Sequence, residues 1–477
     1  MPSRSPWAWL ALSLAIALPA PAPADEPAEA QELRGRLTER EDENRLEHPT
    51  TFSVFGRPLT VSGEASESVA ALREAGLGQA GPDYDRVLWE QAVTAEVFYS
   101  FGHQVALFLQ GEAASEYDLD HDVPDRLSTA YLRRDEMWLF AGDVLESGVS
   151  LEAGRLDYED DRLWWWDADL DAARAVWERG DWELQVSVAQ ELFSDRTSRT
   201  WVEPDQERVL RLMGEFSWDW FPDHALELFA LRASDHSPTE AVGERVAEDR
   251  VDEEDANEYW LGARASGAWQ SRRFGLVGYW LDLGMVRGSA DELEFEDGLP
   301  GNNAEVTAVT HARVSGWAFD VGGTWLLPLA AEPRVSLGWA RGSRGYRQPG
   351  IHANEIGFGG VQRFRRYGEI LDPELANLQV LTAALGCTLL RTSSLDVTYH
   401  YYSLASRATS LRDNGLDPEL TGTSRNVGQG VDVVLALEEW ERVELEVIGS
   451  GFRSGDAFAA HPRSWAWGGL FEIRIAF

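Results

Sequence analysis

The stretch Ser464–Phe477, "SWAWGGLFEIRIAF", ends the chain and alternates between two kinds of side chain. Counted back from Phe477, every second position as far as Trp465 carries an apolar residue or glycine. Glu472 and Arg474 fall on the opposite face. Because successive side chains of a β-strand point to opposite faces, this pattern predicts a strand with one apolar and one polar face.

The same alternation continues through the chain from residue 51. It is clearest in "DWELQVSVAQEL" (181–192), "RVLRLMGEFSWDWF" (208–221) and "RVELEVIGS" (442–450). The predicted strands are mostly about 10–15 residues long, which suits a bilayer crossing better than the usual soluble sheet. The predicted spans are 51–64, 86–101, 103–117, 131–144, 148–158, 171–178, 181–194, 207–221, 224–235, 257–270, 273–288, 305–327, 333–344, 375–391, 394–407, 426–438, 441–454 and 464–477.

The connections between these spans are of two kinds. Short links, such as those at Gly102, Pro222, Ser271 and Glu439, alternate with long polar ones at 118–130, 159–170, 195–206, 236–256, 289–304, 345–374, 408–424 and 455–463. Short turns at one end and long loops at the other are typical of bacterial outer-membrane barrels, and a terminal aromatic residue on the last strand is typical of them too. We therefore predict an all-β fold, a transmembrane antiparallel up-and-down β-barrel of about 18 strands.

The N-terminal segments differ in composition from the rest. Residues 1–24 combine one arginine, the apolar run "WAWLALSLAIAL" (7–18) and an A-x-A pattern ending at Ala24, which is typical of a secretory signal peptide. Residues 25–50 are highly charged and predict a periplasmic leader that is disordered or weakly helical. The barrel is expected to occupy residues 51–477.

The charge of the chain is strongly negative. It carries 81 acidic and 42 basic residues, a formal net charge of -39, and every basic residue is an arginine. This balance excludes general nucleic-acid binding. Cys387 is the only cysteine, so no intrachain disulfide can form.

The tryptophans divide into two groups. Trp177, Trp182, Trp218 and Trp220 flank short turns on the apolar phase, where an amphipathic ring is favoured at the membrane interface. The run Trp164–Trp166 lies instead in the long connection 159–170. We expect this run in an extracellular loop, folded over the polar mouth or touching the membrane.

No motif for catalysis or for a dedicated metal site is present. The nine histidines lack metal-ligand spacing, and no local signature supports a serine hydrolase, so we expect no enzymatic activity and no resident cofactor. The acidic run "AEDRVDEEDANE" (Ala247–Glu258) is the one candidate for loosely bound Ca²⁺ at the outer loops. It lacks the spaced pattern of a dedicated calcium loop, so the sequence favours a solvated outer loop over a calcium site.

Charges on the inward phase of the strands are the candidate pore lining. They decide which solute passes a channel, and arginines lower the barrier for a polyanion. An inward polar residue is also what any water-filled barrel contains. The inward candidates from alternation are Arg174, Arg211, Arg474, Glu183, Glu215 and Glu472.

Two segments resemble the alginate-export outer-membrane porins. They are "EDDRLWWWDADLDAARAVW" (Glu159–Trp177) and "VQRFRRYGEILDPELANL" (Val361–Leu378). The resemblance implies export of a polyuronate through an arginine-rich constriction. It assigns pore roles to Arg174, to the cluster Arg363, Arg365 and Arg366, and to Arg155, whose strand phase depends on whether Gly154 forms a bulge.

The sequence departs from that family in one respect. Members can carry a long periplasmic turn that plugs the pore, whereas every short-side turn here is only a few residues long. Gating by such a turn is therefore in doubt, and an extracellular loop such as 118–130 is the alternative.

Two functions remain open at this point. The first is a passive channel for secretion of an anionic polysaccharide, alginate or a similar polyuronate. The second is a general or anion-preferring diffusion porin for small solutes. In either case we expect a monomer in the bacterial outer membrane with both termini in the periplasm. The expected partners are membrane lipid, the barrel-assembly machinery and, for secretion, periplasmic polysaccharide-export components.

Overall fold

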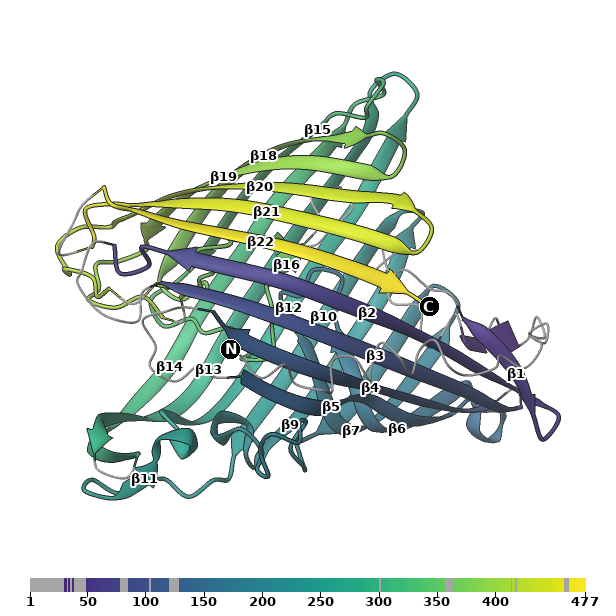
Figure 1. Ribbon diagram of the computed structural model, residues 1–477, viewed down its shortest axis with the longest axis horizontal. Helices are drawn as coiled ribbons and strands as arrows, with labels where there is room; N and C mark the ends of the chain where they lie inside the picture. Colours follow the sequence, from purple (N-terminus) through teal and green to yellow (C-terminus); the bar gives the residue numbers. More distant parts are fainter. Residues whose placement is uncertain are drawn as a thin grey trace, which may run out of the picture.

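The main structural element is an antiparallel sheet that closes on itself. The structure is a computed structural model that describes residues 30–31, 33–34, 37, 49–77, 85–102, 104–119, 128–299, 302–356, 364–412, 414–416, 418–458 and 463–477. Twenty of the described strands belong to this sheet. Strand β2 pairs with β3 on one side and with the last strand, β22, on the other, which closes the barrel (Figure 1).

Among the described residues, 18 strands form the wall, and the predicted number is confirmed. They are β2 (Arg57–Arg73), β3 (Arg86–Gly102), β4 (Val105–Asp118), β5 (Ser128–Ala141), β6 (Val149–Glu159), β7 (Asp167–Arg179), β8 (Trp182–Ala189), β9 (Val209–Phe221), β10 (His224–Asp235), β12 (Glu254–Ser271), β13 (Gly275–Leu299), β14 (Asn303–Leu326), β15 (Arg334–Gly342), β18 (Leu378–Leu389), β19 (Ser393–Leu404), β20 (Asn426–Trp440), β21 (Val443–Ser454) and β22 (Trp465–Ala476).

The other strands are short. β1 (Thr50–Val54) forms a hairpin with the first residues of β2, and β11 (Arg245–Ala247) pairs with the start of β14. β16 (Glu355–Ile356) and β17 (Phe364–Arg365) form a separate two-stranded sheet.

One predicted strand and one predicted loop differ clearly from the structure. The span 51–64 is a hairpin, because Phe55 and Gly56 both adopt positive φ and reverse the chain after β1. The predicted loop 289–304 is mostly strand, because β13 and β14 stay paired as far as Leu299 and Asn303.

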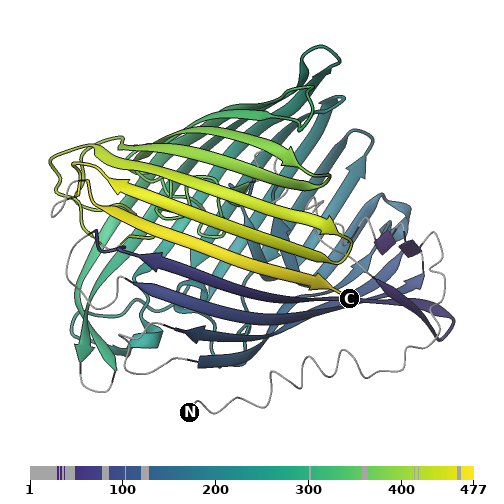
Figure 2. The ribbon, with the colours of Figure 1, turned by 45° about the horizontal axis from the view of Figure 1, so that its top comes forward.

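The two ends of the barrel carry different connections. One end carries the short turns, the longest of which cover residues 142–148 and 327–333. The C-terminus and the β1 hairpin lie at this same end (Figure 2). The long connections emerge at the other end, which is the predicted sorting of loop lengths.

The outer face of the wall is apolar. On β22, the exposed side chains are Trp465, Trp467, Phe471, Ile475 and Phe477, the face predicted from alternation. Trp177, Trp218 and Trp220 are also exposed, as expected of rings at a membrane interface. No helix in the described part of the chain is long and apolar enough to cross a membrane.

The wall is irregular between β5 and β6. These strands pair only where Met137–Ala141 faces Leu151–Arg155. Nearer the long-loop end, β5 hydrogen-bonds to the β8–β9 connection instead. Arg134 N donates to Asp195 O at 2.7 Å, and Thr197 N donates to Leu132 O at 2.9 Å. Within the described part of the sheet, the long-loop ends of β6 and β7 form strand pairs only with each other, so the tip of their hairpin can leave the wall.

The N-terminal segments lie largely outside the described residues. This applies to the predicted signal peptide, 1–24, and to most of the predicted leader, 25–50. The described residues 30–31, 33–34 and 37 are helical, and Leu33 is buried in the main apolar cluster of the barrel.

Candidate functional site

The interior of the barrel is occupied by two connections from its long-loop end. Residues 160–166 join β6 to β7, and residues 343–377 join β15 to β18. The main chains of the two segments are hydrogen-bonded: Asn354 N donates to Leu163 O at 2.9 Å, and Asp167 N donates to Ile351 O at 2.5 Å. The described parts of the two segments, residues 160–166, 343–356 and 364–377, therefore form one folded body, which we call the plug.

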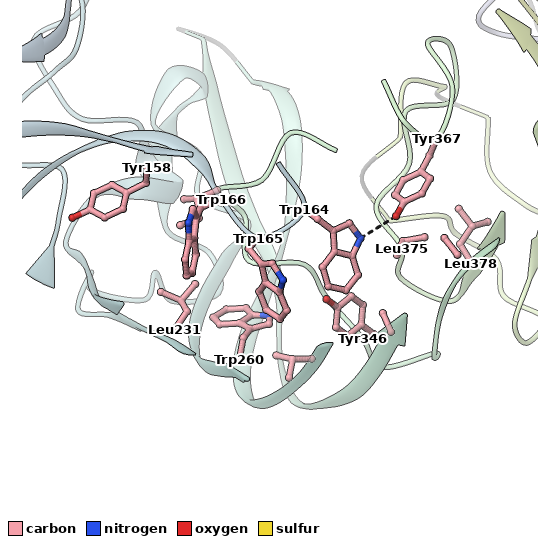
Figure 3. Close-up of a cluster of buried hydrophobic side chains, with 14 of the residues drawn as sticks. Tyr158, Trp164, Trp165, Trp166, Leu231, Trp260, Tyr346, Tyr367, Leu375 and Leu378 are labelled. Carbon is pink, nitrogen blue, oxygen red and sulfur yellow. Dashed lines mark hydrogen bonds between the residues drawn. The ribbon is translucent and has the colours of Figure 1, made fainter. Parts of the chain in front are cut away.

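The core of the plug is the tryptophan run. Trp164, Trp165 and Trp166 are between 0% and 1% exposed. Figure 3 shows Trp164 directed at Tyr367, and the ring of Trp165 stacks on Phe229 of β10 with 5.1 Å between the ring centroids. The prediction that Trp164–Trp166 fold over the mouth or touch the membrane surface is therefore wrong. The free hairpin tip places these rings inside the barrel, where burying their large apolar area is strongly favourable.

Glycines on the inner wall make room for the plug. A Cβ added at Gly262 would lie 1.7 Å from the ring of Trp165. At Gly284 it would lie 2.9 Å from Tyr346 Oη and 3.1 Å from Trp164. The neighbouring residues Leu261 and Leu283 are exposed on the outer face, so these glycines point inward. The wall and the plug are thus complementary in shape.

A buried network of charges holds the plug to the wall. Arg162 donates to Asp282 of β13 at 2.9 Å and to Asp320 of β14 at 3.1 Å. Arg366, from the second plug segment, also donates to Asp320 at 3.1 Å. Arg264 of β12 donates to Asp282 at 2.6 Å. Removing one member of such a network leaves an unpaired buried charge, which is strongly destabilising.

Asp160 connects this network to the tryptophan run. One carboxylate oxygen accepts the main-chain N–H groups of Trp165 (2.7 Å) and Trp166 (2.9 Å), and the other pairs with Arg264. Burial opposes ionisation of Asp160, but Arg264 and the two N–H groups hold the pKa of its carboxyl below the usual value. Asp160 therefore stays charged and fixes the backbone turn that directs the tryptophan rings into the barrel.

A second set of ion pairs fixes the plug nearer the mouth. Arg347 pairs with Glu254, with Glu258 at 3.4 Å and with Glu292 at 2.5 Å. Glu374 accepts a hydrogen bond from the main chain of Gln348 and pairs with Arg412 at 3.0 Å. These ion pairs attach the second plug segment to β12, to β13 and to Arg412 of the β19–β20 connection.

The residue predicted to select the solute, Arg174, lies on the inner wall of β7. It pairs with Glu152 of β6 at 2.5 Å, donates to the carbonyl of Asp157 at 3.1 Å and lies over the ring of Tyr158 at 5.3 Å. Its side chain is 19% exposed.

The other inward candidates are separated around the wall. Arg474 pairs with Glu472 at 3.1 Å and with Glu444 and Glu446 at 3.4 Å each. Arg211 is buried and donates to Gln206 at 2.5 Å. Glu183 is exposed on β8, and Glu215 is half-buried on β9. The ion-pair partners of Arg174 and Arg474 lie on different strands, Glu152 on β6 and Glu444, Glu446 and Glu472 on β21 and β22.

Comparison with known proteins assigns the family. A family model described as "Alginate export" matches residues 57–466. The chain belongs to the alginate export family. Two curated relatives are both described as "Alginate production protein AlgE". The one from Pseudomonas aeruginosa is 26% identical over 327 residues, which is 66% of this chain and 65% of that protein. The one from Pseudomonas syringae pv. tomato is 25% identical over 294 residues, or 60% and 58%.

The match therefore covers less than two thirds of the length of each relative. Among solved structures, Pseudomonas aeruginosa OccK5 (OpdH) has a TM-score of 0.55 at 9% identity, covering 88% of this chain and 98% of that one. The Pseudomonas aeruginosa outer membrane protein OpdK has a TM-score of 0.52 at 10% identity, covering 88% and 98%. At such low identity, this likeness shows the fold alone.

The residues assigned by resemblance to the alginate export family have unequal positions. Arg366 is buried in the network at Asp320, and Arg365 is partly exposed and pairs with Asp372. Arg155 is buried 4.0 Å from Glu191 and shares the alternation phase of the exposed Leu151. Arg363 lies outside the described residues. The pore roles of all four stay predictions.

The sequence analysis missed the residues that hold the plug: Asp160, Arg162, Arg264, Asp282 and Asp320. A signal for three of them was present, because each is a single charge on the inward phase of an apolar strand. These are Arg264 in "WLGARASG", Asp282 in "YWLDLGMV" and Asp320 in "WAFDVGG". The same signal identified Arg174. Pairing between these charges depends on the plug, which alternation alone does not reveal.

Proposed function

We propose that this protein is the outer-membrane channel through which alginate or a similar polyuronate leaves the cell. The observation that carries the proposal is the alginate export family match over residues 57–466, which covers nearly the whole barrel wall. The barrel supplies a closed path lined by its own polar face. The channel has no chemistry of its own, and the polymer is driven by synthesis behind it.

Arginines on the inner wall are the proposed contacts for the polymer. Arg174 and Arg474 each pair with carboxylates of the protein. A uronate carboxylate has the same charge and hydrogen-bonding geometry, so it can replace a protein carboxylate at a guanidinium without a large change in energy. Each contact is weak where water enters, so a polymer can move from one arginine to the next.

The plug is the proposed gate, because its buried side chains, among them Trp164, Tyr346 and Tyr367, pack together in the interior that the polymer must cross. Loop 118–130 was the alternative gate; its residues 120–127 lie outside the described part of the chain. We place the long-loop end outside the cell and the short-turn end, with both termini, in the periplasm. There the channel would meet periplasmic export components.

Conductance across a planar bilayer distinguishes this proposal from an anion-preferring diffusion porin. Purified protein is reconstituted, the plug is loosened by the Gly284→Val substitution, and defined uronate oligomers or neutral oligosaccharides of equal length are added. We expect uronate oligomers to block the current at concentrations where neutral ones do not. Equal block by both sugars, or block by neutral ones only, would overturn the export proposal.

A further inference from the structure

Three carboxylates meet where β10 and β12 are joined. Asp235 is the last residue of β10, Asp255 is the second residue of β12, and Asp252 lies in the segment between them. One oxygen atom from each lies within 4.8 Å of the others. The three residues lie at the long-loop end of the barrel and apart from the plug network.

This cluster is buried and contains an unsatisfied oxygen. Asp252 and Asp255 are each only 9% exposed. Asp255 Oδ2 is buried and has no hydrogen-bond partner among the described residues. Within the described chain, no arginine or histidine lies within 4 Å of the three carboxylates; Arg250, two positions before Asp252, pairs with Glu207 instead. Buried carboxylates of like charge are ordinarily paired or bound to a metal.

Ser237 lies between two of these carboxylates. Its hydroxyl oxygen lies 2.5 Å from Asp235 Oδ1 and 2.7 Å from Asp255 Oδ1. A hydroxyl has one proton, so it can donate to only one of these oxygens. The other contact joins two electron-rich oxygens at short range. A cation that draws these oxygens together removes the repulsion.

We propose that Asp235, Asp252 and Asp255 form a binding site for calcium. The available donors are all hard oxygen atoms, which Ca²⁺ prefers and which it accepts in irregular geometry. Ser237 adds a hydroxyl oxygen. A cavity of about 130 Å³ borders Ser237, Glu240 and Asp252 together with Glu207, Arg208 and Arg250, and it leaves space for water ligands. Mg²⁺ requires near-ideal octahedral geometry and retains its own water, so it fits this arrangement less well.

The bound ion would hold together the two ends of the β10–β12 connection. Asp235 and Asp255 lie at its two ends, and its middle contains β11, which pairs with β14. Calcium at its base therefore fixes a long outer loop to the rim of the barrel. This role is independent of the exported polymer.

Calcium binding to the full-length protein in detergent micelles tests the proposal. After treatment with a chelator, isothermal titration with CaCl₂ should give one saturable site with a dissociation constant on the order of 10⁻⁴–10⁻³ M, as in extracellular calcium modules. Asp255→Asn should abolish this site. The matched control is Asp249→Asn, which removes one charge from the same connection outside the cluster and should leave the site intact.

Thermal unfolding separates calcium from the alternatives. Calcium should raise the melting temperature of the wild type and the control but not that of Asp255→Asn. In the chelator, Asp255→Asn should be at least as stable as the wild type, because one repelling charge is gone; this also shows that the variant folds. Equal calcium responses in all three proteins would overturn the proposal, because they would show that calcium binds diffusely to acidic loops. So would a wild type that gives no calcium response, since the cluster would then be held by a proton.

Discussion

The indole N–H of Trp164 donates to the hydroxyl of Tyr367 at 2.9 Å, across 203 positions of the chain. The Tyr367 hydroxyl in turn donates to Asp320 of the wall at 3.1 Å. This chain of hydrogen bonds joins the two plug segments to each other and to β14. The plug therefore docks as one body, and weakening either segment should release both.

Tyr367→Phe is the smallest change that tests this coupling. It leaves the buried Trp164 N–H without its acceptor and removes one donor from Asp320, at a cost of about 1–3 kcal/mol to the docked state. We expect single-channel recordings to show more frequent openings. Tyr399→Phe, which removes an exposed hydroxyl bonded to Gln429, is the control and should leave the openings unchanged. Identical recordings for both variants would contradict a coupled plug.

Gly284→Val tests the fit between plug and wall by volume. The added side chain would collide with Tyr346 and Trp164, so the plug must withdraw or shift. We expect a clear rise in mean conductance with the barrel still assembled. Gly278→Val is matched to it, since Gly278 lies on the same strand and face and meets no atom closer than 3.9 Å. If Gly284→Val and Gly278→Val have the same mean conductance, the plug does not pack against Gly284.

Asp320→Asn should destabilise the plug more than any change at the mouth. Asp320 accepts from Arg162, Arg366, Tyr367 and Trp280 at 3.0–3.1 Å, and losing its charge leaves two buried arginines without full compensation. Breaking a buried pair in this way costs roughly 3–5 kcal/mol. Limited proteolysis of residues 343–377 in micelles should become much faster. An unchanged cleavage rate would show that Asp320 does not anchor the segment.

The wall of this protein could be predicted from sequence because its physics is local. A lipid-facing strand must be apolar at every second position, and a turn between neighbouring strands must be short. Both rules act over a few residues, so Trp465–Phe477 shows its two faces without reference to any other strand. The number of strands and the sorting of loops follow from repetition of these rules.

The plug could not be predicted in this way, because its contacts join distant parts of the chain. Trp164–Trp166 resemble interface tryptophans in composition, and the incomplete β5–β6 pairing that lets their hairpin leave the wall is not visible in that composition. Asp320 and Arg366 each look like ordinary lumen charges until the second segment brings them together. The motif "YGEILDPELANL" was recognisable, but its Tyr367 and Glu374 hold the plug, a role that spacing alone does not indicate.

Arg174→Gln tests whether a wall arginine contributes to polymer selection. A partly exposed arginine–carboxylate contact contributes about 0.5–1 kcal/mol, so the uronate concentration for half block should rise roughly two- to fivefold. Barrel assembly, measured by heat-dependent gel mobility, should not change. Arg245→Gln removes the same charge from an exposed outer pair with Glu305 and should not affect the block. If the two variants weaken the block equally, the effect is general electrostatics.

Mild acid should loosen the plug through His352. Burial lowers the pKa of this imidazole to about 4, although the nearby Asp160 opposes the shift, whereas a released segment would titrate near 6.5. Because the released state binds the proton more tightly, acid favours release. The effect begins as pH falls below about 6.5 and is complete near pH 4.

The contribution of His352 to the pH dependence can be separated from that of other titrating groups. Burial raises the pKa of Glu369 to about 7, and protonation there favours the docked plug, so the two groups oppose each other. Comparing wild type with His352→Phe at each pH removes the shared contribution. We expect the conductance of the wild type, divided by that of His352→Phe, to rise as the pH is lowered from 7 to 4.5. His311→Gln, at an exposed site, should follow the wild type. A ratio that stays constant with pH would exclude His352 as the proton-binding group.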